Sequence, residues 1–132
     1  MGDAILVVED DPTLVRAMTR NLSARGYDAR GASTMADAVS ALRRERPALV
    51  LLDIDLPDGS GWDVLRALRA AGEADVPVIV MSALRPNPRL CHDLHAIGVL
   101  EKPFPMESLL RLVAQATGRL APPAPADTMS AD

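Results

Sequence analysis

The chain has 132 residues, 48% of them hydrophobic, and its 14 basic and 18 acidic residues leave a formal net charge of −4. This length suits one domain and excludes two full-sized ones, while the acidic balance excludes the basic face of a nucleic-acid-binding protein, so we expect no direct contact with DNA or RNA. The single cysteine excludes an internal disulfide, and the N-terminus lacks a signal-peptide pattern, so we expect a cytoplasmic location. No apolar run approaches the ~20 residues that span a bilayer, so we expect no membrane insertion.

The first strand and the first helix are indicated by two adjacent patterns. Ala4–Val8 is continuously apolar, which is typical of a strand covered on both faces of a sheet. Asp11 followed by Pro12 predicts an N-cap with proline at the first helical position. The helix is expected to end at Gly26 and to bury Leu14, Val15, Met18 and Leu22.

Two further pairs of strand and helix follow along the chain. A weak strand candidate, Tyr27–Ala29, precedes a helix that we expect to begin at a Ser33 cap and to bury Met35, Val39 and Leu42. The apolar run Ala48–Leu52 predicts another buried strand. The helix after it is expected to begin near Ser60 and to bury Trp62, Leu65 and Leu68.

The remaining elements are less regular. Val76–Met81 predicts a buried strand, with Pro77 near its start, where a strand tolerates proline best. Residues 85–89 read RPNPR, and two prolines so close together cannot lie inside a regular helix. The helix that follows must therefore be short or begin late. A weak strand candidate, Val99–Leu100, precedes a last helix from about Pro105, with an inward face made of Met106, Leu109, Leu110 and Val113.

Strands and helices thus alternate over short connections through residues 1–118. This order predicts an α/β fold, a doubly wound five-stranded parallel sheet with helices on both faces and an atypical, short fourth helix. Residues 119–132 are rich in Pro, Ala and small polar residues, which predicts a disordered tail or linker. In such sheets ligands bind beyond the carboxyl ends of the strands, so a functional site is expected there.

Charged and hydroxyl side chains stand at these strand ends. Glu9 and Asp10 follow the first strand, Asp53 the third, Ser82 the fourth and Lys102 the fifth. Three carboxylates at one edge of a sheet repel one another unless a cation neutralises them or their pKa values rise. Oxygen ligands with room for water suit a hard cation, so Mg²⁺ is the expected cofactor.

Each of these residues also has an ordinary structural interpretation. An acid before a helix, such as Asp11, is usually a cap; a serine after a strand is usually a turn former, and a loop lysine is usually a solvated charge. The occurrence of all of them at successive strand ends favours a functional carboxylate site.

Four motifs in order resemble the receiver domains of bacterial two-component systems. They are ILVVEDDP (Ile5–Pro12), LVLLDIDLPDGSG (Leu49–Gly61), PVIVMSA (Pro77–Ala83) and EKPF (Glu101–Phe104), and the resemblance covers roughly residues 3–118. It implies a receiver domain over residues 1–118 with the flavodoxin-like strand order 2-1-3-4-5. A receiver is a signalling domain rather than an enzyme in the usual sense, because it catalyses only its own phosphorylation and dephosphorylation.

The resemblance also implies a role for each site residue. Asp53 matches the phosphoacceptor, Ser82 the hydroxyl that moves to the phosphoryl oxygen, and Lys102 the cation that pairs with the phosphate. The Lys102–Pro103 peptide is usually cis in this family, which is accessible before proline. The expected ligands of Mg²⁺ are Glu9, Asp10, Asp53 and the backbone carbonyl of Asp55.

The sequence departs from the family pattern at several places. The first acid is Glu9, where aspartate is more usual, and the segment from Ser82 to Lys102 spans 20 positions, about two fewer than the family usually has. Val99 stands where an aromatic switch residue is usual, and the RPNPR segment falls on the surface that most receivers use for output. The expected phosphate donor is a histidine kinase or a histidine phosphotransfer protein, and the sequence does not name the downstream partner. These departures leave open a degenerate receiver that acts as a phosphate-independent interaction module.

A second alternative is an enzyme. Asp53-Ile54-Asp55 resembles the DxD motif of haloacid-dehalogenase-type phosphatases, which also form an aspartyl phosphate. Those enzymes usually carry the motif on the first strand and need a longer chain, whereas here the motif follows the third strand.

Overall fold

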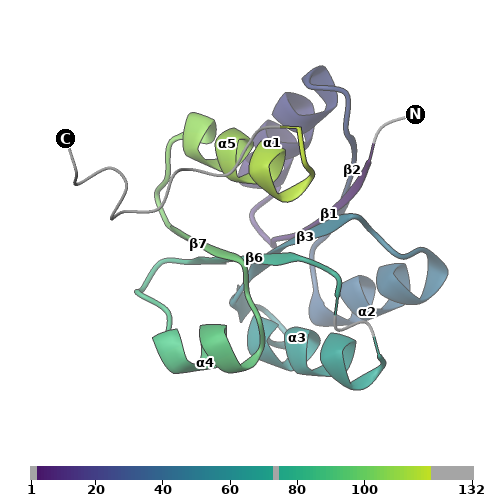
Figure 1. The fold of residues 1–132 in the computed structure, drawn as a ribbon, viewed down its shortest axis with the longest axis vertical. Coiled ribbons are helices and arrows are strands. Elements are labelled where there is room, and N and C mark those ends of the chain that lie inside the picture. The colour runs from purple at the N-terminus through teal and green to yellow at the C-terminus, as the bar shows by residue number, and fades with distance from the viewer. Residues whose placement is uncertain (1–2, 73–74, 120–132) are drawn as a thin grey trace.

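A computed structural model describes residues 3–72 and 75–119 of the chain. Five parallel strands form one sheet in the order β2-β1-β3-β6-β7 (Figure 1). They are β1 (Ala4–Val8), β2 (Asp28–Ala32), β3 (Leu49–Asp53), β6 (Val78–Ser82) and β7 (Gly98–Glu101). Counted within this sheet alone, the order is 2-1-3-4-5, so the predicted doubly wound, flavodoxin-like sheet is confirmed.

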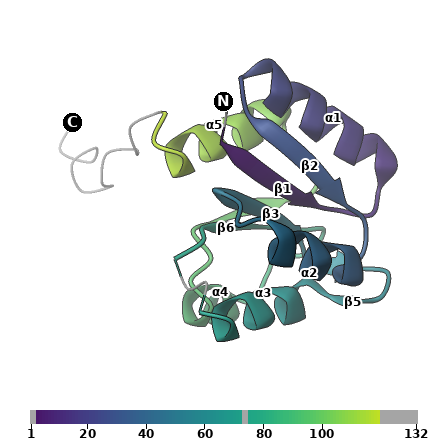
Figure 2. The same cartoon turned by 90° about the vertical axis from the view of Figure 1, so that its right-hand side faces the viewer.

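Helices cover both faces of the sheet. Figures 1 and 2 show α1 (Pro12–Ala24) and α5 (Met106–Ala116) on one face, and α2 (Met35–Arg44), α3 (Gly61–Ala70) and α4 (Pro88–Asp93) on the other. Each layer closes over its own apolar cluster, which explains why β1 is apolar throughout and why β3 and β6 are apolar up to their last residues, Asp53 and Ser82. The cluster under α1 and α5 includes Ile5, Met18, Leu51, Ile79 and Leu109; the cluster under α2, α3 and α4 includes Leu6, Val50, Leu65, Val80 and the half-buried Leu94.

The predicted caps begin two of the helices. The side chain of Asp11 accepts from the Thr13 amide at the start of α1, and the side chain of Ser60 accepts from the Trp62 amide at the start of α3. After α1, Gly26 adopts a φ of +89°, a left-handed conformation that glycine reaches without strain. These local signals were therefore read correctly from the sequence.

The start of α2 was predicted wrongly by one residue. Its cap is Thr34, whose hydroxyl accepts from the amide of Asp37, and not Ser33. The fully buried position of α2 is Ala38, whereas Val39 is half-buried and outside both apolar clusters. The small Ala38 faces the sheet because α2 packs close to the strands there, and hydrophobicity alone does not reveal such a contact.

Strand boundaries also differ from the prediction. β2 begins at Asp28 and reaches Ala32, and β7 covers Gly98–Glu101, so both weak strands are longer than their apolar signals. Pairing with β1 and β6 extends these two edge strands through polar residues. A small antiparallel hairpin, β4 (Asp55–Leu56) with β5 (Gly59–Ser60), was not predicted and follows β3 directly.

The fourth helix is short and begins late, as expected. Asn87 caps α4, and Pro88 occupies its first position, where a missing N–H costs nothing. None of the residues of α4 is buried. Instead, the guanidinium of Arg69 on α3 donates to the carbonyls of Leu94 and His95 at the end of α4, at 3.0 and 3.2 Å.

The described chain ends beside the turn between α1 and β2. Arg119 lies 4.0 Å from the ring centroid of Tyr27 and donates to the carbonyl of Arg25 at 2.6 Å. The expected tail falls almost wholly on residues 120–132, which lie outside the described residues. Among the helices of the described residues, none is long and apolar enough to cross a membrane.

Candidate functional site

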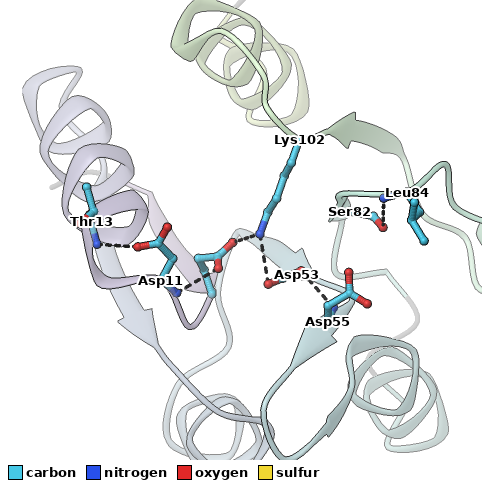
Figure 3. Close-up of polar contacts among 8 residues, drawn as sticks. Asp11, Thr13, Asp53, Asp55, Ser82, Leu84 and Lys102 are labelled. Carbon is cyan, nitrogen blue, oxygen red and sulfur yellow. Dashed lines mark hydrogen bonds and ion pairs between the residues drawn. The ribbon is translucent and has the colours of Figure 1, made fainter.

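The carboxyl ends of the strands bring four predicted residues to one edge of the sheet. Asp53 is the last residue of β3 and Glu9 follows β1; they are 2% and 1% exposed, although both have carboxyl side chains. Lys102 follows β7 and reaches back toward Asp53, as Figure 3 shows. Asp10, next to Glu9, is exposed to solvent. The parallel sheet produces this gathering, because it sets all strand ends at the same edge.

Lys102 holds two of these carboxylates. Its Nζ lies 2.5 Å from Oε1 of Glu9 and 3.2 Å from Oδ2 of Asp53. The other oxygen of Asp53, Oδ1, accepts a hydrogen bond from the Asp55 amide at 3.0 Å. Asp53 is thus oriented from both sides, by an ammonium and by a backbone amide (Figure 3). The peptide bond between Lys102 and Pro103 is cis, as expected.

Burial and charge shift the pKa values of the ion pair. Burial raises the pKa of Glu9 above its ordinary value, because the surrounding protein disfavours a carboxylate there, while Lys102 and the Asp11 amide oppose the rise. The Asp11 amide donates to Oε2 of Glu9 at 3.1 Å. Burial acts against the ammonium of Lys102, yet the carboxylates of Glu9 and Asp53 raise its pKa above the ordinary value. Lys102 is therefore positively charged at neutral pH.

The three acids fit a hard divalent cation. Glu9, Asp10 and Asp53 each offer a carboxylate oxygen, and these oxygens lie within 4.8 Å of one another. Hard oxygen donors of this kind are the ligands of Mg²⁺, which keeps several waters and needs only one or two carboxylates from a protein. The exposed Asp10 leaves the cluster open to a cation and its waters from the solvent side.

Ser82 stands apart from this ion pair. It ends β6, the neighbour of β3, where Met81 is the register partner of Asp53. Its side chain is buried and its hydroxyl accepts from the Leu84 amide at 3.3 Å (Figure 3). The loop that begins at Leu84 is therefore bonded to the hydroxyl that the resemblance assigns to phosphate sensing.

Val99, one of the departures from the family pattern, and Leu84, just before the RPNPR segment, both lie at the surface. Val99 on β7 is 43% exposed and Leu84 is 78% exposed. Val99 pairs in register with Val80 and has no aromatic ring, and Leu84 presents an apolar side chain to solvent where the loop leaves β6.

Asp58 and the hairpin that carries it were not predicted from the sequence. Asp58 lies at the turn of the β4–β5 hairpin, and its carboxylate accepts from the amides of Met35 and Ala36 at the start of α2, at 2.7 and 3.2 Å. The dipeptide Asp58-Gly59 is a signal for a tight turn. No local signal, however, links that turn to a helix more than 20 residues earlier in the chain.

Comparisons with known proteins agree with this geometry. A family model described as the response regulator receiver domain matches residues 5–114. The transcriptional regulatory protein KdpE of Mycobacterium tuberculosis is 40% identical over 117 residues, which are 87% of this chain and 51% of the relative. The response regulator MprA of Mycobacterium bovis is 33% identical over 132 residues and 57% of its length. The chain thus spans about half the length of these relatives.

Two solved structures match along nearly their whole length. The non-phosphorylated receiver domain of HemR from Leptospira biflexa is 30% identical with a TM-score of 0.81, covering 93% of this chain and 99% of that one. The signal receiver domain of a LuxO repressor protein from Vibrio parahaemolyticus is also 30% identical, with a TM-score of 0.79, and the match covers 90% and 92% of the two chains.

Proposed function

The chain belongs to the response regulator receiver domain family, and from this premise we propose that it accepts a phosphoryl group on the carboxylate of Asp53 and signals by changing conformation. The observation that carries the proposal is the arrangement around Asp53. A buried carboxylate is held by Lys102 and by the Asp55 amide, beside two further acids at the edge of the sheet. This arrangement orients one carboxylate as a nucleophile and supplies a cation for the phosphate.

The reaction is an in-line transfer between donor and Asp53. The P–N bond of a phosphohistidine breaks as a carboxylate oxygen of Asp53 forms a P–O bond, and the electron pair of the broken bond remains on the donor's imidazole nitrogen. When bound by Glu9, Asp10, Asp53 and the carbonyl of Asp55, Mg²⁺ would neutralise the repulsion between carboxylate and phosphate. Lys102 then exchanges its carboxylate contacts for the phosphoryl group, which it holds as a compact charge.

Ser82 is proposed to report the new phosphate to the rest of the domain. Its hydroxyl now accepts from the Leu84 amide, and as a donor it would turn toward a phosphoryl oxygen. A change at this hydroxyl acts directly on the first turn of the loop before α4. The signal would thus leave the site through the segment that the sequence marks as atypical.

The proposed phosphate donor is a histidine kinase or a histidine phosphotransfer protein, and the downstream partner is a further protein. The relatives named above are a transcriptional regulatory protein and a response regulator, and this chain spans about half their length. The output of the longer proteins is therefore a property of those relatives. A kinase that draws its phosphate from ATP would place the reaction in the cytoplasm.

The alternatives receive less support. A phosphate-independent module has no need of a half-buried lysine between two buried carboxylates, because partly removing these charges from water costs free energy. A phosphatase with the motif Asp53-Ile54-Asp55 is disfavoured because this motif lies within residues 5–114, which match the receiver domain family.

Phosphorylation with acetyl phosphate and Mg²⁺ tests the proposal. Intact mass should increase by one phosphoryl group, and hydroxylamine should remove it because an acyl phosphate is labile. Asp53→Asn should abolish the labelling, as should an excess of EDTA. Asp63→Asn, which changes an exposed acid paired with Arg66 on α3, serves as the matched control and should be labelled as the wild type is.

Two outcomes would refute this function. Labelling that survives in Asp53→Asn would assign the phosphate to another residue, and labelling that survives EDTA would remove the role of the metal. Turnover of a generic phosphate ester would instead favour the enzyme alternative.

A further inference from the structure

The hairpin that follows Asp53 is tied to a distant helix at its tip. Between β4 and β5, the carboxylate of Asp58 accepts two backbone hydrogen bonds from α2, with 2.7 Å to the Met35 amide and 3.2 Å to the Ala36 amide. Both oxygens of the carboxylate are used, Oδ1 for the first bond and Oδ2 for the second. The contact joins residues more than 20 positions apart in the chain.

Asp58 completes the first turn of α2. The first amides of a helix have no partner inside it. Here the hydroxyl of Thr34 accepts a hydrogen bond from the Asp37 amide at 3.0 Å. The carboxylate of Asp58 accepts hydrogen bonds from the two preceding amides, those of Met35 and Ala36. A carboxylate also suits the positive end of the helix dipole. The hydrogen bonds from these amides, above all the one from Met35, lower the pKa of Asp58 below its ordinary value. The carboxylate of Asp58 is therefore charged at neutral pH.

The rest of the hairpin is fixed at its base. The Gly61 amide donates to the Ile54 carbonyl at 2.8 Å and closes the segment on itself. A side chain at position 61 would collide with the backbone oxygen of Asp53, so the base packs directly on the acceptor residue. At the tip, Gly59 packs close to the sulfur of Met35, where an added Cβ would lie only 3.0 Å away.

Asp55 lies in this hairpin, between the fixed base and the fixed tip. Its amide donates to Oδ1 of Asp53, and its register partner across the hairpin is Ser60. A two-stranded hairpin of two-residue strands is not stable by itself. Its conformation therefore depends on the contacts at both ends, and Asp58 supplies two of those at the tip.

We propose that Asp58 is a positioning residue for the cation site: by anchoring the hairpin tip to the start of α2, it holds the backbone of Asp55 where its carbonyl serves as a metal ligand. The inference rests on the proposed function, because it takes the carbonyl of Asp55 as a ligand of Mg²⁺. It adds a residue outside the four strand ends, and it makes α2 part of the framework of the site.

The test compares Mg²⁺ affinity with the integrity of the tie, by which we mean the two hydrogen bonds from the Met35 and Ala36 amides to Asp58. Asp58→Ala removes both acceptor oxygens, and Asp58→Asn keeps one of them. Mg²⁺ titration of the phosphate-free protein, followed by emission of the sole tryptophan, Trp62, just after the hairpin, gives the dissociation constant. Amide exchange at Met35 and Ala36 reports the tie directly. Removing an outer partner of a metal ligand weakens affinity by roughly tenfold, so we expect that loss in Asp58→Ala and a smaller one in Asp58→Asn.

The control is Asp63→Ala, which removes an exposed acid from the first turn of α3 without touching the hairpin tie. Its Mg²⁺ affinity should equal that of the wild type. Faster exchange at Met35 and Ala36 with unchanged affinity would overturn the inference, because the tie would then be only a helix cap. Unchanged exchange would overturn it as well. A wild-type chain that binds no Mg²⁺ would instead refute the proposed function, which separates the two failures.

Discussion

Lys102 and Glu9 form an ion pair in which Nζ lies 2.5 Å from Oε1, closer than the 3.2 Å between the same Nζ and Oδ2 of Asp53. The extra methylene of glutamate, relative to the more usual aspartate, gives Glu9 the length to reach the lysine while its other oxygen accepts from the Asp11 amide. Lys102 is therefore held by two partners, and under the proposed function an incoming phosphoryl group would compete with both.

The first prediction concerns the balance of charge in this buried site. Lys102→Met should lower the free energy of unfolding by about 2–3 kcal/mol. This loss lies at the low end of what it costs to break a buried ion pair, because Lys102 keeps some solvent exposure. The double variant Glu9→Gln with Lys102→Met should recover part of this loss, since it removes one of the two buried carboxylates that Lys102→Met leaves uncompensated. Urea unfolding without Mg²⁺ measures both. A double variant no more stable than Lys102→Met would contradict the explanation.

The second prediction is a pH dependence that arises from Asp58. Its pKa in the folded protein lies below the ordinary value of 3.8. The stability that it contributes is thus complete above 3.8 and is lost as the pH falls through the lower, folded value. The difference in unfolding free energy between wild type and Asp58→Asn should shrink in that acid range. Asp75, whose pKa Arg46 also lowers, is present in both proteins and cancels from the difference. A difference that stays constant with pH would count against the two bonds.

The third prediction concerns the segment that carries the signal. Beryllofluoride with Mg²⁺ should change amide exchange most within residues 84–92, because Ser82 bonds the Leu84 amide and α4 buries none of its residues. The change should fade at Leu94 and His95, whose carbonyls Arg69 holds. In Arg69→Met the change should spread into these residues, whereas Arg66→Met, one turn earlier on α3, should behave as wild type. Equal protection of residues 84–92 in both states would refute this output route.

The fourth prediction concerns the lifetime of the phosphate. Leu84 follows Ser82 by two residues and presents an apolar side chain that is 78% exposed and unable to orient a hydrolytic water. Leu84→Asn should therefore lose phosphate faster than the wild type, as followed by intact mass after the donor is removed. Leu84→Met, of similar volume and polarity, is the matched control and should lose phosphate at the wild-type rate. Slower or equal loss in Leu84→Asn would show that this side chain does not face the path of the water.

The fifth prediction places the end of the folded unit. Ending the chain after Arg119 should leave thermal stability and phosphorylation unchanged, because residues 120–132 offer few large apolar side chains to bury. Ending it after Gly118 also removes the contact of Arg119 with Tyr27 and the bond to Arg25. That loss should cost about 1 kcal/mol. A large drop in melting temperature for the longer of the two truncated chains would show that the tail docks on the domain.

The sequence by itself determined the layer order, most helix starts and the set of residues at the strand ends. These features depend on local signals: unbroken apolar runs mark buried strands, Asp11 and Ser60 cap the helices that follow them, and prolines delay α4. Because parallel strands end at one edge, the list of Glu9, Asp10, Asp53, Ser82 and Lys102 follows from their positions alone. The weak edge strands were harder to delimit, since pairing extends them through polar residues.

Only the tertiary structure decided which of these side chains contact one another. Lys102 is paired with Glu9 as well as with Asp53, while Ser82 is bonded to the Leu84 amide. The hydrogen bonds from α2 to Asp58 and from Arg69 to the end of α4 join segments more than 20 residues apart. Such contacts depend on the packing of helices against the sheet, and no periodicity in the sequence encodes the distance between two side chains on different elements. For this reason the residues of the site were predictable, whereas the contacts that orient them were not.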